Sequence, residues 1–433
     1  MIQQEKIKSV DYLFNRIISE RVRDSMEPKY SLLMGAGCSV SSGIVSAKGV
    51  IDMLKAIAYL RELPAENPEP PFLDLEYGNL IPFLQTWYEN NKDDLNFLEF
   101  EKYQEEQIYN KLCEKIEDFD GYFEEVFHGI LFREYPNYKS LMSVEKHKIL
   151  SELLKQYSAK IASDMEYSYW FTKYSTASED IHSFLTELMN NKNPSEAYIF
   201  LADLFVNNMF SVAFTTNFDN LLGEALSLLG VRSKEIWFDT NEVDNTLSKI
   251  SPNIVKLHGD YMYNNTKNLS SETRKLSLPL QFQMESVLSK GGLIVIGYSG
   301  ADNSIMYTLE KISEKYSFPL FWCEMEDKIS EDKIHWRARN LVLNSSNAYF
   351  VPIENFDTLV EKLRKNYILY AKLRKNKREE KGTEYRETIY DEEYLEVALQ
   401  RIKKIIDKVI QQNIQISDKA VPVPPPDVDL LVK

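Results

Sequence analysis

Four short motifs in this chain place glycines and polar side chains directly after apolar runs. They are GAGCS at 35–39, TTNFD at 215–219, LHGD at 257–260 and GYSGAD at 297–302. Glycines let backbone approach a ligand closely, and exposed backbone N–H groups can hold a pyrophosphate. Amide, carboxylate and imidazole groups can hold a sugar hydroxyl or a water and move a proton. The motifs therefore favour chemistry on a ligand that contains phosphate and sugar.

The first motif leads from the apolar run at 30–34 into Gly35, Ala36 and Gly37, and then into a serine-rich segment that contains Ser39. We expect a strand, a tight turn and the start of a helix, an arrangement that favours anions. It is not the dehydrogenase fingerprint, because a third glycine would fall at Val40. A tight strand-to-helix turn without a ligand would give the same pattern.

The second motif places Thr215, Asn217 and Asp219 just after the run at 209–214 and just before a predicted helix. Asn217 could hold a sugar hydroxyl or an attacking water without adding charge, and Asp219 could accept from a carboxamide NH2. Thr215 would border the same cleft. Helix capping is the competing explanation, because Asp219 and Asn220 are both common N-cap residues.

The third motif contains His258, which follows a predicted strand and precedes a glycine. None of the other four histidines has this placement. An imidazole titrates near neutral pH and can take a proton from water or a hydroxyl, so His258 is the candidate general base. A lone histidine is also a common packing residue, and the motif by itself leaves both interpretations open.

The fourth motif leads from the run at 292–296 into Gly297, Tyr298 and Ser299, with a predicted helix beginning around Asp302. Its design matches that of the first motif, so it is a second candidate cradle for an anion or a ribose. Two such cradles suit a dinucleotide.

The elements that must position these motifs are six short runs rich in β-branched or aromatic residues, separated by helical patterns. The runs lie at 30–34, 209–214, 253–257, 292–296, 318–322 and 348–351. Such alternation predicts an α/β fold with a Rossmann-like, doubly wound and mostly parallel sheet. Ligands bind such sheets outside the carboxyl ends of the strands, which is where the motifs fall.

The glycine distribution and the helical patterns divide the chain into three parts. Residues 1–52 and 205–355 are predicted to form the α/β domain, 53–204 an all-helical insertion, and 356–433 a C-terminal extension of helices and a Pro-rich arm. The apolar face of the helix predicted at 392–412 either packs on its own domain or makes an oligomer or partner contact. The arm at 421–433 is either a docking peptide or a disordered tail.

Composition excludes several classes of protein. With 51 Lys+Arg against 66 Asp+Glu the net charge is -15, so direct nucleic-acid binding is not expected. Cys38, Cys113 and Cys323 are too scattered for a disulfide framework or a four-ligand zinc site, so we expect a reducing compartment and no metal. Without a membrane-length apolar run or a signal peptide, the expected location is the cytoplasm, away from membranes.

Taken together and in this order, the four motifs resemble the sirtuin-like family, and more closely its NAD-hydrolysing branch in bacterial anti-phage defence than the protein deacetylases. The resemblance covers about 30–45 and 205–355. It implies an NAD pocket lined by Gly35, Ala36, Gly37 and Ser39, with Asn217 at the nicotinamide ribose, Asp219 at the carboxamide, His258 as catalytic base, and Gly297, Tyr298 and Ser299 in a ribose-binding turn.

Two departures from the deacetylase pattern matter. Deacetylating sirtuins carry a four-cysteine zinc module between the histidine and the last glycine turn, whereas no cysteine lies between His258 and Gly297 here. The family's Asp-Phe-Arg after the first loop is replaced by IVSAKGV at 44–50, which leaves one NAD contact unassigned. The missing zinc module counts against protein deacylation.

The resemblance therefore implies an NAD+ hydrolase that forms nicotinamide and ADP-ribose and depletes NAD during anti-phage defence. It also implies a homo-oligomer with a protein partner, first a HerA-type ATPase and next a short Argonaute; the chain has no nucleotide-binding loop of the Gly-x-x-x-x-Gly-Lys-Ser/Thr type. The alternatives are a non-catalytic sensor of NAD or ADP-ribose, and a deacylase or ADP-ribosyltransferase that acts on protein.

Overall fold

The computed structural model describes residues 2–23, 28–62, 79–114, 119–174, 178–237, 247, 251–258, 276–330, 332–379 and 400. The chain divides into two compact units, Met1–Thr388 and Ile389–Lys433. All the helices and strands named below lie in the first unit.

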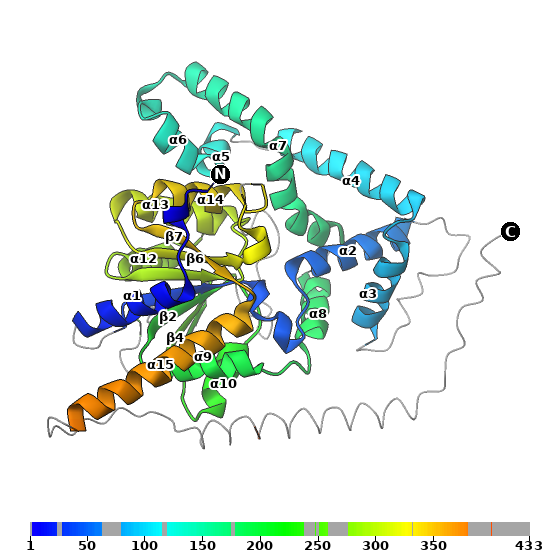
Figure 1. The fold of residues 1–433 in the computed structure, drawn as a ribbon. Helices are drawn as coiled ribbons and strands as arrows, with labels where there is room; N and C mark the ends of the chain where they lie inside the picture. The colour runs from blue at the N-terminus through cyan, green and yellow to red at the C-terminus, as the bar shows by residue number, and fades with distance from the viewer. Residues whose placement is uncertain are drawn as a thin grey trace, which may run out of the picture. The chain divides into compact units, whose positions relative to one another are not determined.

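The described residues contain a seven-stranded sheet in which every neighbouring pair is parallel (Figure 1). The strands are β1 (Tyr30–Met34), β2 (Phe210–Thr215), β3 (Lys234–Trp237), β4 (Asn253–Lys256), β5 (Gly292–Ile296), β6 (Leu320–Met325) and β7 (Ala348–Ile353). Their order is β3-β4-β2-β1-β5-β6-β7, so β2, β3 and β4 lie on one side of β1, with β3 at the edge, and β5, β6 and β7 follow in order on the other. The predicted doubly wound, Rossmann-like α/β fold is confirmed.

Each of the six predicted runs overlaps one of these strands, although β2, β6 and β7 extend one to three residues beyond the run. The central strands β1 and β5 are buried throughout, as their apolar residues require. Strand β3 was not predicted. Its sequence KEIW carries two charged residues. An edge strand tolerates them because it has a neighbouring strand on one side only.

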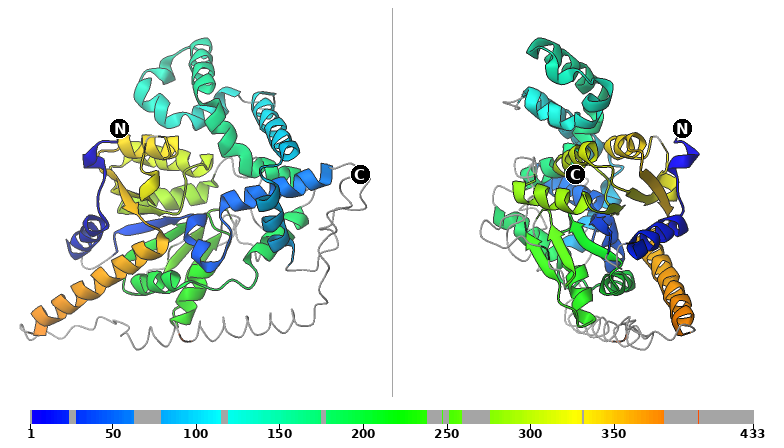
Figure 2. Two further views of the ribbon diagram at one scale, coloured as in Figure 1. Left: turned by 45° about the vertical axis from the view of Figure 1, so that its right-hand side comes forward. Right: turned by 90° about the vertical axis from the view of Figure 1, so that its left-hand side faces the viewer.

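Two groups of helices cover the sheet (Figures 1 and 2). The first group is α1 (Val10–Arg23), α9 (Glu196–Val206), α10 (Leu221–Leu228) and α15 (Phe356–Glu379), which pack on one another and on β2 and β7. The second group is α12 (Leu278–Leu288), α13 (Asn303–Lys315) and α14 (Trp336–Asn344). Its apolar residues Met284, Leu309 and Val342 share one core with Val295 and Phe350 of the sheet.

A helical insertion separates β1 from β2, as predicted. It contains α2 (Ala47–Glu62), α3 (Leu80–Asn91), α4 (Leu95–Glu114), α5 (Phe119–Val126), α6 (His128–Glu134), α7 (Ser143–Tyr174) and α8 (Ser178–Met189). Helix α2 packs on α3 and α7, while α5 and α6 pack on α13. The exact domain limits at 52/53, 204/205 and 355/356 stay a prediction.

The C-terminal extension begins with α15, one of the helices expected after residue 355. Apart from Gln400, the helix predicted at 392–412 and the arm at 421–433 lie outside the described residues. Within the described part of the chain, no helix combines the length and apolarity needed to cross a membrane.

Candidate active site

The four motifs begin in one row at the carboxyl edge of the sheet. In the register of the sheet, Thr215 pairs with both Met34 and Lys256, and Met34 also pairs with Ile296. These four residues end β2, β1, β4 and β5. The residues that follow them therefore gather at the edge where parallel α/β sheets bind ligands.

Two of the motifs are glycine turns that pack against each other. The N–H of Gly37 donates to the carbonyl of Gly297 over 3.0 Å, and the N–H of Gly35 donates to that of Ile296, also over 3.0 Å. A Cβ on Gly35 would lie 2.4 Å from the Gly297 carbonyl oxygen, and one on Gly297, whose φ is +64°, would lie 2.6 Å from the backbone nitrogen of Cys38. The glycines thus allow the two turns to lie in direct contact.

The prediction that a helix begins directly after Gly37 is wrong. Gly37 itself lies in a short 3-10 turn, η2 (Ala36–Cys38), which is followed by a second, η3 (Val40–Ser42), and α2 begins only at Ala47. Serine hydroxyls bond to groups other than the helix backbone here: Ser39 faces the site and Ser42 accepts from the N–H of Ser195. Donors for a phosphate at this motif would therefore come from turns and not from a helix N-terminus.

Asn217 is buried at the base of the site and fixed by its own donors. Its Nδ2 donates to the Gly35 carbonyl over 3.1 Å and to Ser39 Oγ over 3.0 Å, and its backbone N–H donates to Thr215 Oγ1 over 3.0 Å. Its Oδ1 atom is buried and accepts no hydrogen bond from any described residue. Since buried acceptors are normally satisfied, this oxygen is suited to a ligand hydroxyl or a water.

Asp219 combines capping with a role in the site. Its Oδ1 accepts from the N–H of Leu221 at the start of α10, and its Oδ2 accepts from the Ser39 hydroxyl over 2.7 Å. Ser39 Oγ also lies 3.0 Å from the hydroxyl of Tyr198 on α9. Burial, and then the charge of Asp219, raises the pKa of Tyr198. Asn217, Ser39, Asp219 and Tyr198 therefore form one buried polar cluster.

Lys256 is a member of the site that sequence reasoning did not find. It ends β4 with 1% of its surface exposed, and its Nζ donates to the carbonyls of Asp219 over 2.5 Å and Phe218 over 3.4 Å. It therefore holds the turn that carries Asn217. The available signal was a lysine directly after the apolar pair Ile254 and Val255, two residues before His258.

His258 lies beside Asp302, whose role was also not predicted, and the two form an ion pair when the imidazole is protonated. The His258 Nε2 lies 2.8 Å from Asp302 Oδ2, while Asp302 Oδ1 caps α13 by accepting from Ile305 N and Ser304 Oγ. Burial alone would raise the pKa of the Asp302 carboxyl, but His258 and these two donors bring the pKa below its ordinary value. Helix capping is a sufficient explanation for an aspartate before a helix, so the sequence did not predict that Asp302 pairs with His258.

The remaining predicted residues contribute mainly backbone or packing. Tyr298 is buried in the core, with its ring centroid 6.0 Å from that of Trp322, and its hydroxyl donates to the Asp302 carbonyl over 3.5 Å. Ser299 is exposed and accepts from the N–H of Ala301. Ala36 is half-buried in the first turn. The structure thus brings all the predicted residues to this edge, although Tyr298 points its ring inward.

No metal cluster accompanies this site within the described ranges, where no group of three or more His, Cys, Asp or Glu side chains is placed to hold an ion. Cys38 and Cys323 are buried free thiols. What the site does offer is a buried amide acceptor, an imidazole held by a carboxylate, and two glycine turns. This set can accept a sugar hydroxyl, take a proton from a water or a hydroxyl, and lie close to a phosphate.

The fold is an α/β fold of the Rossmann-like type, and this edge is where such folds bind ligands. Comparison with known families adds that residues 211–343 match the SIR2-like domain. The matched segment runs from β2 to α14 and includes Asn217, His258 and the turn at Gly297. It supports a sirtuin-like domain protein with an NAD-related enzymatic function. A search of curated proteins finds no match to the chain.

Proposed function

We propose that the protein hydrolyses NAD+ to nicotinamide and ADP-ribose at the carboxyl edge of the sheet. The observation that carries the proposal is the common placement of Asn217 and His258, each two residues beyond the paired strand ends Thr215 and Lys256. A buried acceptor and a carboxylate-held imidazole at one edge suit a reaction at a ribose carbon. The SIR2-like match over this segment supports NAD as the substrate.

In the proposed reaction the N-glycosidic bond to nicotinamide breaks through an oxocarbenium-like state, and water adds at the same ribose carbon. Asn217 Oδ1 accepts from a ribose hydroxyl or from that water. His258 takes the proton that the water loses, and Asp302 stabilises the imidazolium that forms. One NAD+ and one water thus give nicotinamide, ADP-ribose and one proton.

The test is NAD consumption by the purified protein, alone and with its genomic-neighbour protein and DNA. His258→Ala and Asn217→Ala should both abolish turnover, whereas His147→Ala should keep it, because His147 is an exposed residue of the insertion that pairs with Asp120. NAD that binds but stays intact under every condition would contradict hydrolysis and support a sensor. Turnover that survives both site substitutions would refute the assigned roles.

We further propose that this activity serves anti-phage defence by depleting NAD in the cytoplasm. The support is the resemblance of the four motifs, which also suggests a homo-oligomer and a HerA-type ATPase partner, with a short Argonaute as the next candidate. Because uncontrolled NAD loss would kill the cell, the insertion and the C-terminal extension are the candidate sites of restraint. If cellular NAD falls after phage infection in cells with the wild-type protein but not with His258→Ala, this role is supported. A constant NAD level in both would oppose it.

A further inference from the structure

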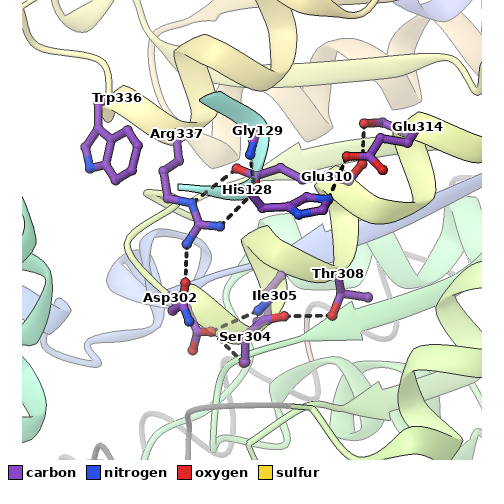
Figure 3. A network of polar contacts seen from close by, with 12 residues as sticks. His128, Gly129, Asp302, Ser304, Ile305, Thr308, Glu310, Glu314, Trp336 and Arg337 are labelled. Atoms are coloured by element: carbon purple, nitrogen blue, oxygen red, sulfur yellow. Dashed lines mark hydrogen bonds and ion pairs between the residues drawn. The ribbon is translucent and has the colours of Figure 1, made fainter. Parts of the chain in front are cut away.

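A buried arginine outside the site fastens two turns of α13. The Nε and Nη2 atoms of Arg337 donate to Glu310 Oε1 over 3.2 Å and to Glu310 Oε2 over 2.9 Å, and its Nη1 donates to Asn303 Oδ1 over 2.5 Å (Figure 3). Asn303 and Glu310 are seven positions apart, which places them on the same face of the helix. Arg337, in the first turn of α14, therefore holds the first two turns of α13 together.

The fastened end of α13 is the end that carries the partner of His258. Asp302 is the N-cap of α13 and directly precedes Asn303. The two oxygens of its carboxylate have separate tasks, because Oδ1 caps the helix and Oδ2 faces His258. A shift of the first turn of α13 would therefore move the carboxylate relative to the imidazole.

Charge neutralisation of Glu310 by Arg337 does not explain all three contacts of the arginine. Buried ion pairs are often no more stabilising than apolar replacements, so a pair of this kind is weak evidence for a role in stability alone. The third contact of Arg337, to the neutral amide of Asn303, adds nothing to charge balance. It does fix the residue next to Asp302, as a planar guanidinium with several donors can do.

The helical insertion contacts the same group of residues. The N–H of Gly129, at the start of α6, donates to Glu310 Oε2 over 3.3 Å, and the neighbouring His128 lies 2.6 Å from Glu314 (Figure 3). A Cβ at position 129 would lie 3.1 Å from Glu310 Cδ, closer than side chains usually approach. Glycine therefore allows the insertion to reach the carboxylate that Arg337 holds.

We infer that Arg337 is a positioning residue, which keeps Asp302 aligned with His258 by fixing the first turns of α13, and that Gly129 joins the insertion to this arrangement. The catalytic consequence rests on the proposed NAD hydrolysis. The structural consequence does not, because the His258–Asp302 pair can be observed without substrate.

The experiment compares Arg337→Lys and Arg337→Gln with Arg364→Lys in the full chain. Arg364 is the control, because it also pairs with a buried carboxylate, Asp203 at 3.0 Å, between α15 and α9, although its side chain is 14% exposed against 2% for Arg337. The first readout is the imidazole N–H signal of His258 in spectra of 15N-histidine-labelled protein, assigned by its loss in His258→Ala. Because Nε2 lies 2.8 Å from Asp302 Oδ2, the signal of an N–H there is expected to depend on how close this carboxylate stays.

This signal should broaden or disappear in both Arg337 variants, less in Arg337→Lys, and persist in Arg364→Lys. The second readout is NAD hydrolysis, where kcat should fall at least about tenfold in Arg337→Gln while KM changes little, as expected for a misplaced catalytic group. Gly129→Ala should change both readouts in the same direction, but less.

Three outcomes would overturn part of the argument. Arg337 variants that unfold more easily but keep the wild-type His258 signal and kcat would make Arg337 purely structural. No such signal in the wild-type protein would contradict the ion pair itself. A signal that depends on Arg337 in a protein that never consumes NAD would support the positioning role and refute the proposed hydrolysis.

Discussion

The Nε2 of His258 lies 2.8 Å from Oδ2 of Asp302, although the strands that lead to these residues, β4 and β5, are separated by β2 and β1. Neighbouring strands lie about 4.8 Å apart, so the starting points of the two loops are about 14 Å from each other. The pair therefore spans the row of strand ends from which Asn217 and Gly35 also emerge. This connection turns two separate motifs into one site.

Asp302→Asn tests whether the carboxylate supports catalysis. The amide can still cap α13 but cannot stabilise an imidazolium, so the fold should persist while NAD hydrolysis falls about 100-fold or more. The measurement is kcat by NAD consumption, with Asp332→Asn as a control at an exposed carboxylate. An unchanged kcat in Asp302→Asn would leave this carboxylate with only its capping role.

The depressed pKa of Asp302 predicts a dependence of stability on pH. A carboxyl whose pKa is lower in the folded state than in the unfolded state stabilises the fold above its unfolded value of about 3.9, and this contribution is lost as the pH falls through the folded pKa. The unfolding free energy of the wild type should therefore approach that of Asp302→Asn as the pH falls below about 4. Denaturant titrations at several pH values measure this, and a gap that instead widens in acid would contradict the pairing.

Much of the fold was predictable because buried parallel strands have a strong local pattern. The run at 292–296 is apolar throughout and is β5, whereas KEIW at 234–237 has no such pattern and becomes a strand only by pairing with β4. The turns around Gly37 were mispredicted because Ser39 and Ser42 bond to residues far along the chain, Asp219 and Ser195. In both segments the conformation is decided by contacts with distant residues, which the local sequence does not reveal.

The candidate site shows the same division. Asn217 and His258 were predictable, because both follow apolar strands and have side chains suited to chemistry. Asp302 and Lys256 were not, because each has a sufficient local explanation: a helix cap for Asp302 and a strand end for Lys256. Their roles depend on residues more than 35 positions away, His258 and Asp219, which only the folded chain brings near.

Asn217 allows a separation of stability from catalysis. In Asn217→Ala the Gly35 carbonyl and Ser39 lose a buried donor, which should lower the unfolding free energy by about 1–3 kcal/mol. Asn217→Asp replaces this donor with an acceptor and adds a negative charge beside the cluster that contains Asp219, so it should be at least as unstable. Urea unfolding measures both variants, with Asn190→Ala as the exposed control.

Both Asn217 variants should also lose NAD hydrolysis under conditions where they remain folded. Asn217→Ala has no acceptor in place of Oδ1, and Asn217→Asp no longer has the Nδ2 donor that orients the side chain. Hydrolysis retained by folded Asn217→Ala would mean that Oδ1 has no part in the reaction, whatever the loss of stability.

The contact between the glycine turns can be tested by comparing Gly297 with Gly43, because both have a left-handed backbone. Gly297 has φ of +64° and Gly43 has φ of +80°, so alanine at either position should cost about 1 kcal/mol from backbone strain. At Gly43 the nearest atom to a new Cβ is Nζ of Lys192 at 3.5 Å, which can move. At Gly297 the nearest atoms are backbone atoms of Cys38 and Gly37, at 2.6 and 2.9 Å, which cannot move without displacing the first turn.

Gly297→Ala should therefore lower the unfolding free energy by more than Gly43→Ala and reduce NAD hydrolysis at least about tenfold, because displaced turns no longer present their backbone to the ligand. Gly43→Ala should keep kcat within about twofold of the wild type. Thermal unfolding and NAD consumption measured on both variants separate the two effects. Equal losses would mean that left-handed strain alone accounts for Gly297; a larger loss confined to Gly297→Ala would mean that contact between the turns maintains the site.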